Sequence, residues 1–540
     1  MTSIDTKGSP LNSTARAGQR EWIGLAVLML PTLLIAMDLT VLHLAVPALS
    51  ADLQPTSAQL LWITDIYGFM IAGSLITMGT LGDRIGRRKL LMIGAAAFGF
   101  ASVLAAFSTS PGMLIAARAL LGVAGATLMP STMSLIRNMF LDPQQRTAAI
   151  GIWVSGFSAG SVIGPLVGGI LLEHFSWGSV FLLGVPVMVL LLIAGPLLLP
   201  EYKDPNPGRF DLLSAGMSLA AVLLVIFGLK QMAQDGLGTL PALSITAGLV
   251  IGFIFIQRQR RLADPLIDLR LFRVPAFTAS LATYTLGIFA GFGTFLFIAQ
   301  YLQLVLGLSP LEAGLWSAPG SVAFVIGSNL APRVVRHVRP AYLVAGGLAL
   351  AAIGIGLITQ VGFDSLALIV AGNILMSIGF GFTFTLTVDL VVAAAPPERA
   401  GAASAIAETG AELGGALGLA VLGSLGMAVY RSQVMAAMPA AVPPEAIEAA
   451  QETLAGALAV AGQLPGEVGA ALLDAARQAF IQGLQLNAVI GVVGFVFLAV
   501  LTATMLRHIR PHAEPHGETE PERVEQYPTE HRQPEMQLGD

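Results

Sequence analysis

Cysteine is absent from this 540-residue sequence, and charged residues are scarce. Without cysteine the chain forms no disulfide and no thiolate metal site. Charged residues make up 11% of the chain, against about 25% in soluble domains. The sequence also lacks a GxxxxGK[ST] phosphate loop, an HExxH zinc motif and a basic–aromatic surface. These absences argue against an ATP-driven motor, a metalloenzyme and a nucleic-acid-binding protein, so we expect no enzyme activity, no metal and no cofactor.

Long hydrophobic runs take the place of these features. Hydrophobic residues make up 55% of the chain, and the mean hydropathy is +0.77. The runs are about 20 residues long, which is the length of a membrane-crossing helix and about twice that of a barrel strand. The sequence therefore predicts an all-α polytopic membrane protein with 14 transmembrane helices. These fall at roughly 23–48, 59–80, 90–108, 112–135, 147–172, 178–199, 211–230, 240–257, 277–304, 311–331, 341–361, 365–393, 400–428 and 482–506.

The distribution of basic residues predicts the orientation of these spans. With the N-terminus placed inside, the inside segments up to Arg510 hold 22 Lys and Arg, whereas the outside segments hold only three, Lys230, Arg431 and Arg477. Such an excess is typical of cytoplasmic loops, so both termini are expected in the cytoplasm. The first 20 residues lack an apolar core, so the first span is expected to direct membrane insertion. The high alanine and glycine content suggests a bacterial inner (plasma) membrane.

A weak internal repeat divides the chain. Glycines recur every four residues in the fifth span (160, 164, 168) and in the thirteenth (410, 414, 418), which lets neighbouring helices approach closely. Spans 1–6 and 9–14 are therefore expected to be equivalent halves, as in secondary transporters. The expected parts are a cytoplasmic tail 1–22, an N-terminal half 23–199, two inserted helices with a linker 200–274, a C-terminal half 275–506 and a disordered cytoplasmic tail 507–540. Within the C-terminal half, a long extracellular loop is expected at 429–480, and its residues 443–480 are expected to form an amphipathic hairpin on the outer surface.

Six segments together identify a family resemblance. They are GTLGDRIGRRK (Gly79–Lys89), LIAARALLGVAGATLMP (Leu114–Pro130), GSVIGPLVGG (Gly160–Gly169), DLTVLHLAVPAL (Asp38–Leu49), SPLEAGLWSAP (Ser309–Pro319) and RAGAASAIAETGAELGGALG (Arg399–Gly418). Together they resemble motifs of the major facilitator superfamily and of its fourteen-helix drug:proton antiporters, the quaternary-ammonium and multidrug efflux type. His43 departs from the pattern, because the family usually has asparagine there. The tenth span also has no acid after Glu312, although some relatives carry one.

The resemblance implies a function and a set of residues. It implies proton-coupled efflux of lipophilic, mainly cationic drugs by alternating access, in a protein that we expect to be monomeric. It assigns Arg118 to proton coupling and Gly160, Gly164, Pro165, Gly168 and Gly169 to the antiporter motif. It makes the loop with Gly79, Asp83, Arg84, Gly86 and Arg87, together with Arg137, a cytoplasmic gating motif. In that motif Asp83 anchors a contact between the halves, with Arg84, Arg87 and Arg137 as its charge partners.

Acidic residues at membrane depth are the candidates for proton coupling and substrate binding. An ionisable side chain there costs about 2.5–3.5 kcal/mol to insert, and the candidates are Asp38, Asp65, Glu408 and Glu412. Because a buried carboxylate that holds a proton does not also hold a cation easily, competition between the two would couple them. The alternatives are that Asp38 bonds within the bundle, that Asp65 is solvated near the outer surface, and that the two glutamates line a water-filled vestibule.

The sequence leaves alternatives open for the roles of several other residues and for the function. Arg118 requires a carboxylate or carbonyl partner, because a guanidinium keeps its charge, and a purely structural ion pair is the alternative. Asp389 lies close enough to a span end to be solvated. Aromatic residues are candidates for a cation-binding lining, namely Trp62, Tyr67, Trp153, Phe157 and Tyr301. The alternative functions are a dedicated exporter of one natural product or antibiotic, and a non-transporting membrane sensor or scaffold.

Overall fold

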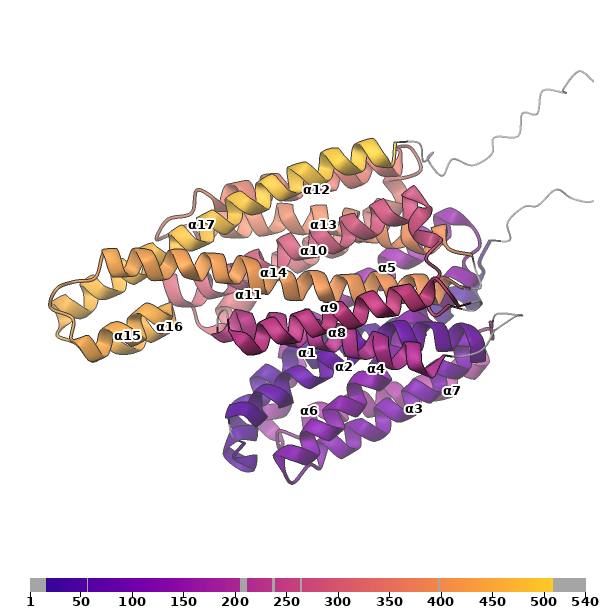
Figure 1. Ribbon diagram of the computed structural model, residues 1–540, viewed down its shortest axis with the longest axis horizontal. Helices are drawn as coiled ribbons and strands as arrows, with labels where there is room; N and C mark the ends of the chain where they lie inside the picture. Colours follow the sequence, from indigo (N-terminus) through magenta and orange to yellow (C-terminus); the bar gives the residue numbers. More distant parts are fainter. Residues whose placement is uncertain are drawn as a thin grey trace, which may run out of the picture.

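The computed structural model describes residues 16–55, 57–203, 211–235, 238–262, 265–396 and 399–507, and within these ranges the protein is helical without a strand (Figure 1). Most of the expected terminal tails, including residues 508–540, lies outside the described residues. The first and last helices begin and end at the same end of the bundle, which we call the terminal end (Figure 1). The other end is called the opposite end.

Each predicted span range contains a helix. The N-terminal half holds α1 (Gln19–Leu53), α2 (Ser57–Ile85), α3 (Arg87–Ala106), α4 (Pro111–Met139), α5 (Pro143–His174), α6 (Ser179–Leu182) and α7 (Gly184–Leu198). The insertion holds α8 (Leu212–Asp235) and α9 (Thr239–Gln259), followed by η1 (Leu271–Arg273). The C-terminal half holds α10 (Pro275–Gln300), η2 (Tyr301–Val305), α11 (Pro310–Val334), α12 (Pro340–Ile358), α13 (Leu366–Ala394), α14 (Ala400–Ala436), α15 (Pro444–Glu452), α16 (Leu454–Ala461) and α17 (Gly466–Met505).

The all-helical membrane fold is confirmed, but the count of fourteen spans is not. Among the described residues, eleven helical segments are long and apolar enough to cross a membrane. Helices α2, α5 and α11 also occupy predicted ranges but are not among these eleven segments. The sixth span is divided into α6 and α7, because Pro186 has no N–H to donate to the carbonyl one turn earlier.

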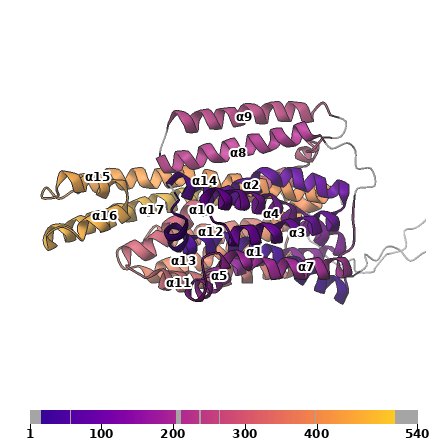
Figure 2. The same ribbon diagram turned by 90° about the horizontal axis from the view of Figure 1, so that it is seen from below.

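The predicted outer hairpin is wrong. Residues 429–480 do not lie as a loop on the surface, because α14 and α17 both continue beyond the bundle and carry α15 and α16 at their tip (Figures 1 and 2). This projection has a core of its own, in which Tyr430 and Leu472 are fully buried and the Tyr430 hydroxyl donates to the Ala450 carbonyl at 2.7 Å. The two long helices contain no proline, so nothing in their sequence stops them at the bundle.

The two halves pack in the same way. Helix α1 packs on α5, α2 on α4, and α3 on α4 and α7. The equivalent helices of the other half repeat these pairs, with α10 on α14, α11 on α13, and α12 on α13 and α17. The repeated glycines make the first pair of contacts close, since Gly160 faces Leu33 of α1 and Gly414 faces Thr285 of α10. The chain is therefore built of two similarly packed six-span units.

The inserted helices lie outside these two units. Figure 2 shows α8 and α9 side by side along one flank of the bundle. Helix α8 covers the seam between α2 and α14, where Ile226 and Leu229 pack with Phe69 and Ala416 in one apolar cluster. The rings of Trp62 and Phe227 stack at 6.2 Å between centroids. The insertion thus closes one side of the boundary between the halves.

Candidate functional site

A buried ion pair joins α1 and α4. Arg118 is 1% exposed, and its Nη1 lies 3.0 Å from Oδ2 of Asp38. Its Nε donates to the carbonyl oxygen of Ile63 on α2 at 2.7 Å. The guanidinium therefore has the carboxylate and carbonyl partners that its permanent charge requires, and one residue ties together three helices of the N-terminal half.

The ring of Tyr67 lies against this guanidinium. Its centroid is 4.9 Å from the Arg118 Cζ, and that of Phe181 is 5.9 Å away, both within cation–π range. Tyr67 is completely buried. The cation that this aromatic residue faces is thus an arginine of the protein itself, which differs from the expected lining for a bound cation.

Of the other aromatic candidates, only Trp153 and Phe157 contact each other among the described ring pairs. Trp153 is buried and donates from Nε1 to the Thr132 hydroxyl at 3.1 Å, with Phe157 edge-on to its ring. The Tyr301 hydroxyl donates to the Gly362 carbonyl at 2.6 Å. Trp62 is 42% exposed and packs on the inserted α8. These side chains stabilise separate helix contacts in this structure and form no common wall.

A small pocket reaches Asp38. It lies between α1, α3 and the α6–α7 junction, and its wall is apolar apart from Asp38 and Ser102. Phe98 and Phe181 form part of that wall. The sequence analysis missed these residues, because they belong to no motif and only helix packing brings them to Asp38.

The two acids of α14 lie in the other half. Glu408 is 5% exposed, so it does not line an open vestibule in this state, whereas Glu412 is exposed. Helix α14 packs against α10 of its own half and against α2 of the other half, so both glutamates lie on a helix that contacts both halves. Asp65 is partly buried on α2, and the side chain of His43 lies outside the described residues.

The glycine-rich loop joins the halves at the terminal end. Arg87 is fully buried and forms an ion pair with Asp83. The other Asp83 oxygen, Oδ2, accepts from the Ala402 backbone N–H of α14 at 3.1 Å. A Cβ added at Gly79 would lie 2.8 Å from the Gly401 carbonyl. Gly86 has φ of +112°, a conformation that side chains disfavour, so each glycine has a steric reason to be there.

One of the expected charge pairs of Asp83 is present in the part of the chain that the structure describes. Arg87 is a partner of Asp83, and Arg137 donates to the Ala395 and Ala393 carbonyls at the end of α13, at 3.1 and 3.4 Å. This contact also joins the two halves, so Arg137 helps to hold them together through α13, whereas Asp83 does so through α14. The role of Arg84 beside Asp83 stays a prediction.

An ion pair between the halves was not predicted. Asp389 of α13 is 2% exposed and accepts from Arg146 Nε at 2.9 Å and from the Thr147 hydroxyl at 2.7 Å. The alternative of a solvated Asp389 is therefore wrong for this state. With Asp83 and Arg137, this pair makes the terminal end a broad polar contact between the two halves, which we call the terminal closure.

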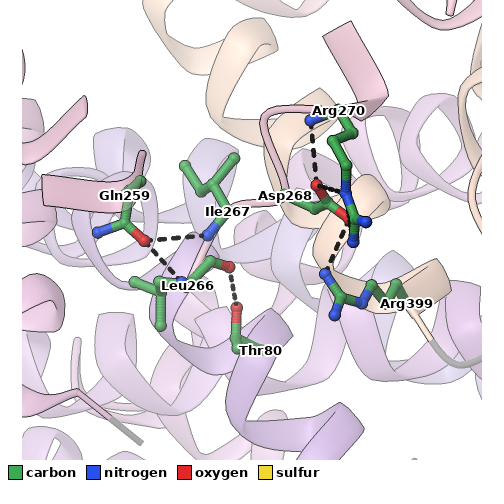
Figure 3. A network of polar contacts seen from close by, with 7 residues as sticks. All are labelled: Thr80, Gln259, Leu266, Ile267, Asp268, Arg270 and Arg399. Carbon is green, nitrogen blue, oxygen red and sulfur yellow. Dashed lines mark hydrogen bonds and ion pairs between the residues drawn. The ribbon is translucent and has the colours of Figure 1, made fainter. Parts of the chain in front are cut away.

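The segment between α9 and α10 crosses this closure (Figure 3). The Leu266 carbonyl accepts from the Thr80 hydroxyl of α2 at 3.0 Å, and the Leu266 N–H donates to Gln259 Oε1 at 2.6 Å. Asp268 accepts from Arg399, just before α14, at 3.0 Å and also pairs with Arg270. We call residues 265–273 the strap, because they contact one helix of each half.

The strap gives a pH-dependent prediction. Burial raises the pKa of Asp268, but hydrogen bonds from Arg270 and the charges of Arg399 and Arg270 outweigh it, so the pKa lies below its usual value. The unfolded chain then binds more protons near its own carboxyl pKa of about 3.9, and stability falls as the pH falls through that region. Asp268→Asn is expected to lower the unfolding temperature slightly at pH 7, since a partly exposed ion pair contributes about 1 kcal/mol or less. Thermal unfolding at pH 7 and pH 3 should show a smaller difference from the unmodified protein at pH 3 than at pH 7.

The exposed Asp364 offers a matched control. Asp364→Asn makes the same chemical change in a loop away from the strap, and it should leave the unfolding temperature unchanged at both pH values. A deficit in Asp268→Asn that is as large at pH 3 as at pH 7 would contradict the ion-pair explanation.

The antiporter-motif glycines lie between α5 and α1. Gly160 and Gly168 face Leu33 and Val41 of α1, with no room for a side chain, whereas Gly169 faces open space. Gly164 is buried, and the side chain of Pro165 lies outside the described residues. Helix α5 is continuous from Pro143 to His174. Close packing is thus a property of this segment in the described state, and its part in gating stays a prediction.

Two equivalent helical units, buried acids in both and a polar closure at one end define a membrane transport protein that works by moving its halves. The chain belongs to the major facilitator superfamily, whose sequence profile matches residues 28–419. It is a multi-pass membrane protein of a family that carries small molecules. Among the described residues, no group of three or more potential metal ligands occurs.

Similar proteins include several exporters. The chain is 45% identical over 502 residues to the multidrug efflux pump LfrA of Mycolicibacterium smegmatis, covering 93% of this chain and 99% of that protein. It is 36% identical over 466 residues to the methyl viologen resistance protein SmvA of Salmonella typhimurium, with 86% and 93% coverage. The tetracenomycin C resistance and export protein of Streptomyces glaucescens is 32% identical over 495 residues, with 90% and 92% coverage.

A solved structure has a similar fold. The human organic anion transporter MFSD10 (TETRAN) matches with a TM-score of 0.59, covering 88% of this chain and 99% of that one. At 16% sequence identity, this likeness concerns the fold alone.

Proposed function

We propose that this protein exports several lipophilic, mainly cationic drugs in exchange for protons. The observation that carries the proposal is the pair of acidic centres in opposite halves, Asp38 with Arg118 and Glu408 with Glu412. Support comes from the likeness to LfrA and SmvA, whose names describe multidrug efflux and resistance to the dication methyl viologen. The proton gradient would supply the driving force without a cofactor.

The arrangement suggests how protons and cations exclude each other. A charged Asp38 is neutralised by Arg118, and protonation would remove its negative charge and free a guanidinium donor. Glu408 and Glu412 lie one turn apart on α14, so a cation held by either carboxylate would oppose protonation of both. Binding of one species would then favour release of the other.

The terminal closure fits one half of an alternating-access cycle. We place the terminal end in the cytoplasm, because basic residues concentrate in the connections predicted there. The closed terminal end would then correspond to a state in which drug leaves and protons enter from outside. Separation at Asp83, Arg137 and Asp389 would give the opposite state.

The test uses inverted membrane vesicles that contain the protein and hold a pH gradient. Adding ethidium or a quaternary ammonium compound is expected to release protons from the vesicles, in proportion to the amount of protein. Vesicles that carry a known drug:proton antiporter serve as the positive control. No proton release, while the control responds, would contradict the proposal, and a response to a single narrow compound class would favour a dedicated exporter.

A further inference from the structure

The hydroxyl group of Tyr67 has no place in the transport scheme above. The side chain is completely buried, and its oxygen has no hydrogen-bond partner among the described residues. A buried hydroxyl without a partner destabilises a protein, so phenylalanine would fit this position at least as well. The hydroxyl therefore contributes nothing to stability in the state described.

The direction of the side chain is defined by α4. The Tyr67 ring lies 4.9 Å from the Arg118 Cζ, while a Cβ added at Gly125 would lie 3.6 Å from the Tyr67 oxygen. Arg118 and Gly125 are about two turns apart on α4, and Gly125 is nearer the terminal end. The tyrosine thus extends along α4 from the guanidinium toward the middle of the bundle, and its oxygen lies away from the charged group.

The acids of α14 lie at the depth to which this oxygen points. Helices α2 and α14 run antiparallel, with Gly79 facing Ala405 and Asp83 bonded to Ala402. This register places Glu412 opposite the part of α2 just after Tyr67, one to two turns nearer the terminal end. The Arg118 guanidinium lies against the ring of Tyr67, and α14, which carries Glu412, packs against the same helix α2. Tyr67 is thus positioned between the charged groups of the two halves.

We propose that Tyr67 is a positioning residue for proton coupling, whose hydroxyl donates a hydrogen bond to the Glu412 carboxylate when the halves adopt their other arrangement. This inference rests on the proposed function. A bond made in only one of two states favours that state, and an ionised carboxylate accepts it more strongly than a protonated one. Because the same ring contacts Arg118, loss of a proton from Glu412 would shift the Tyr67 ring and so change the position of Arg118 relative to Asp38.

Tyr67→Phe tests this proposal, because it keeps the ring and removes only the hydroxyl. In proteoliposomes, proton-coupled exchange of tetraphenylphosphonium should fall at least about tenfold, equivalent to about 1.4 kcal/mol. The dissociation constant of tetraphenylphosphonium at pH 8 should change less than twofold. The pH below which this binding weakens should rise, and the unfolding temperature should stay the same or increase.

Two further variants separate the proposed role from a structural one. Tyr430→Phe removes an equally buried hydroxyl that does have a partner, the Ala450 carbonyl at 2.7 Å, so it should lower the unfolding temperature and leave exchange unchanged. The double variant Tyr67→Phe with Glu412→Gln should exchange tetraphenylphosphonium no more slowly than Glu412→Gln alone, because both changes break the same bond.

The outcomes that overturn the inference are specific. Exchange by Tyr67→Phe at the unmodified rate would overturn it, as would losses from Tyr67→Phe and Glu412→Gln that simply add. If the unmodified protein releases no protons with tetraphenylphosphonium, the proposed function has failed instead. The two failures are therefore distinguished by the unmodified protein in the same assay.

Discussion

Asparagine at position 38 is expected to reduce proton-coupled efflux at least about a hundredfold. The asparagine amide does not bind a proton at physiological pH. It also leaves the Arg118 guanidinium, which is 1% exposed, without its negatively charged partner. Breaking a buried pair in this way costs about 3–5 kcal/mol, and about 2.8 kcal/mol already corresponds to a hundredfold change. Drug-induced proton release in inverted vesicles measures the loss.

A matched control exists on the same helix. Asp52 of α1 is exposed and accepts from the Trp177 Nε1–H at 2.7 Å, a bond that an asparagine oxygen also makes. Asp52→Asn should therefore export at the unmodified rate. Adding Arg118→Gln to Asp38→Asn removes the unpaired charge, so it should restore the unfolding temperature without restoring export. Normal export by Asp38→Asn would rule out Asp38 as the proton site.

Asparagine at position 83 is expected to slow turnover about tenfold to a hundredfold while drug affinity changes less than threefold. Asp83 pairs with buried Arg87 and accepts from the Ala402 N–H across the boundary between the halves. An amide carries no charge and offers one acceptor oxygen in place of two, and a charge-assisted hydrogen bond contributes about 1.5–3 kcal/mol. The closed terminal end should lose population, because the lost bond exists only when the halves meet.

Spin labels can measure this change directly, because the chain contains no cysteine to replace. Labels at two introduced cysteines, one on each half at the terminal end, should report a longer mean distance in Asp83→Asn. The control is Asp142→Asn, since Asp142 caps α5 at the same end by accepting from the Gln145 N–H at 2.8 Å, and asparagine caps equally well. Lost drug binding with unchanged turnover would show that Asp83 belongs to the substrate site.

The membrane made the helices predictable. A buried backbone in lipid has to satisfy its own hydrogen bonds, so each long apolar run could only be a helix. This argument fails where the chain leaves the bilayer, and there the prediction for residues 429–480 was wrong. Hydropathy does not show that α14 and α17 continue into water and meet around Tyr430, because that region is stabilised by a small core of its own.

The candidate site was predictable where chemistry demands a partner. A guanidinium at membrane depth requires an acid, and Arg118 pairs with Asp38. The pairing of Asp389 with Arg146 was not predictable, since the two residues are separated by 243 positions and meet only through the docking of the halves. The setting of Tyr67 against Arg118 depends on the rotation of α2 about its axis, which packing decides and hydropathy does not.

The terminal closure also imposes an order on the synthesis of the molecule. The Ala402 N–H that bonds Asp83 comes 319 residues later in the chain, and Arg399, which holds the strap, comes 131 residues after Asp268. A ribosome must therefore insert twelve of the predicted spans before either contact can form. Until then, Asp83 can pair with Arg87 but not with the Ala402 N–H. The face of the first half that later packs against the second half stays exposed to lipid and to the insertion machinery during this time.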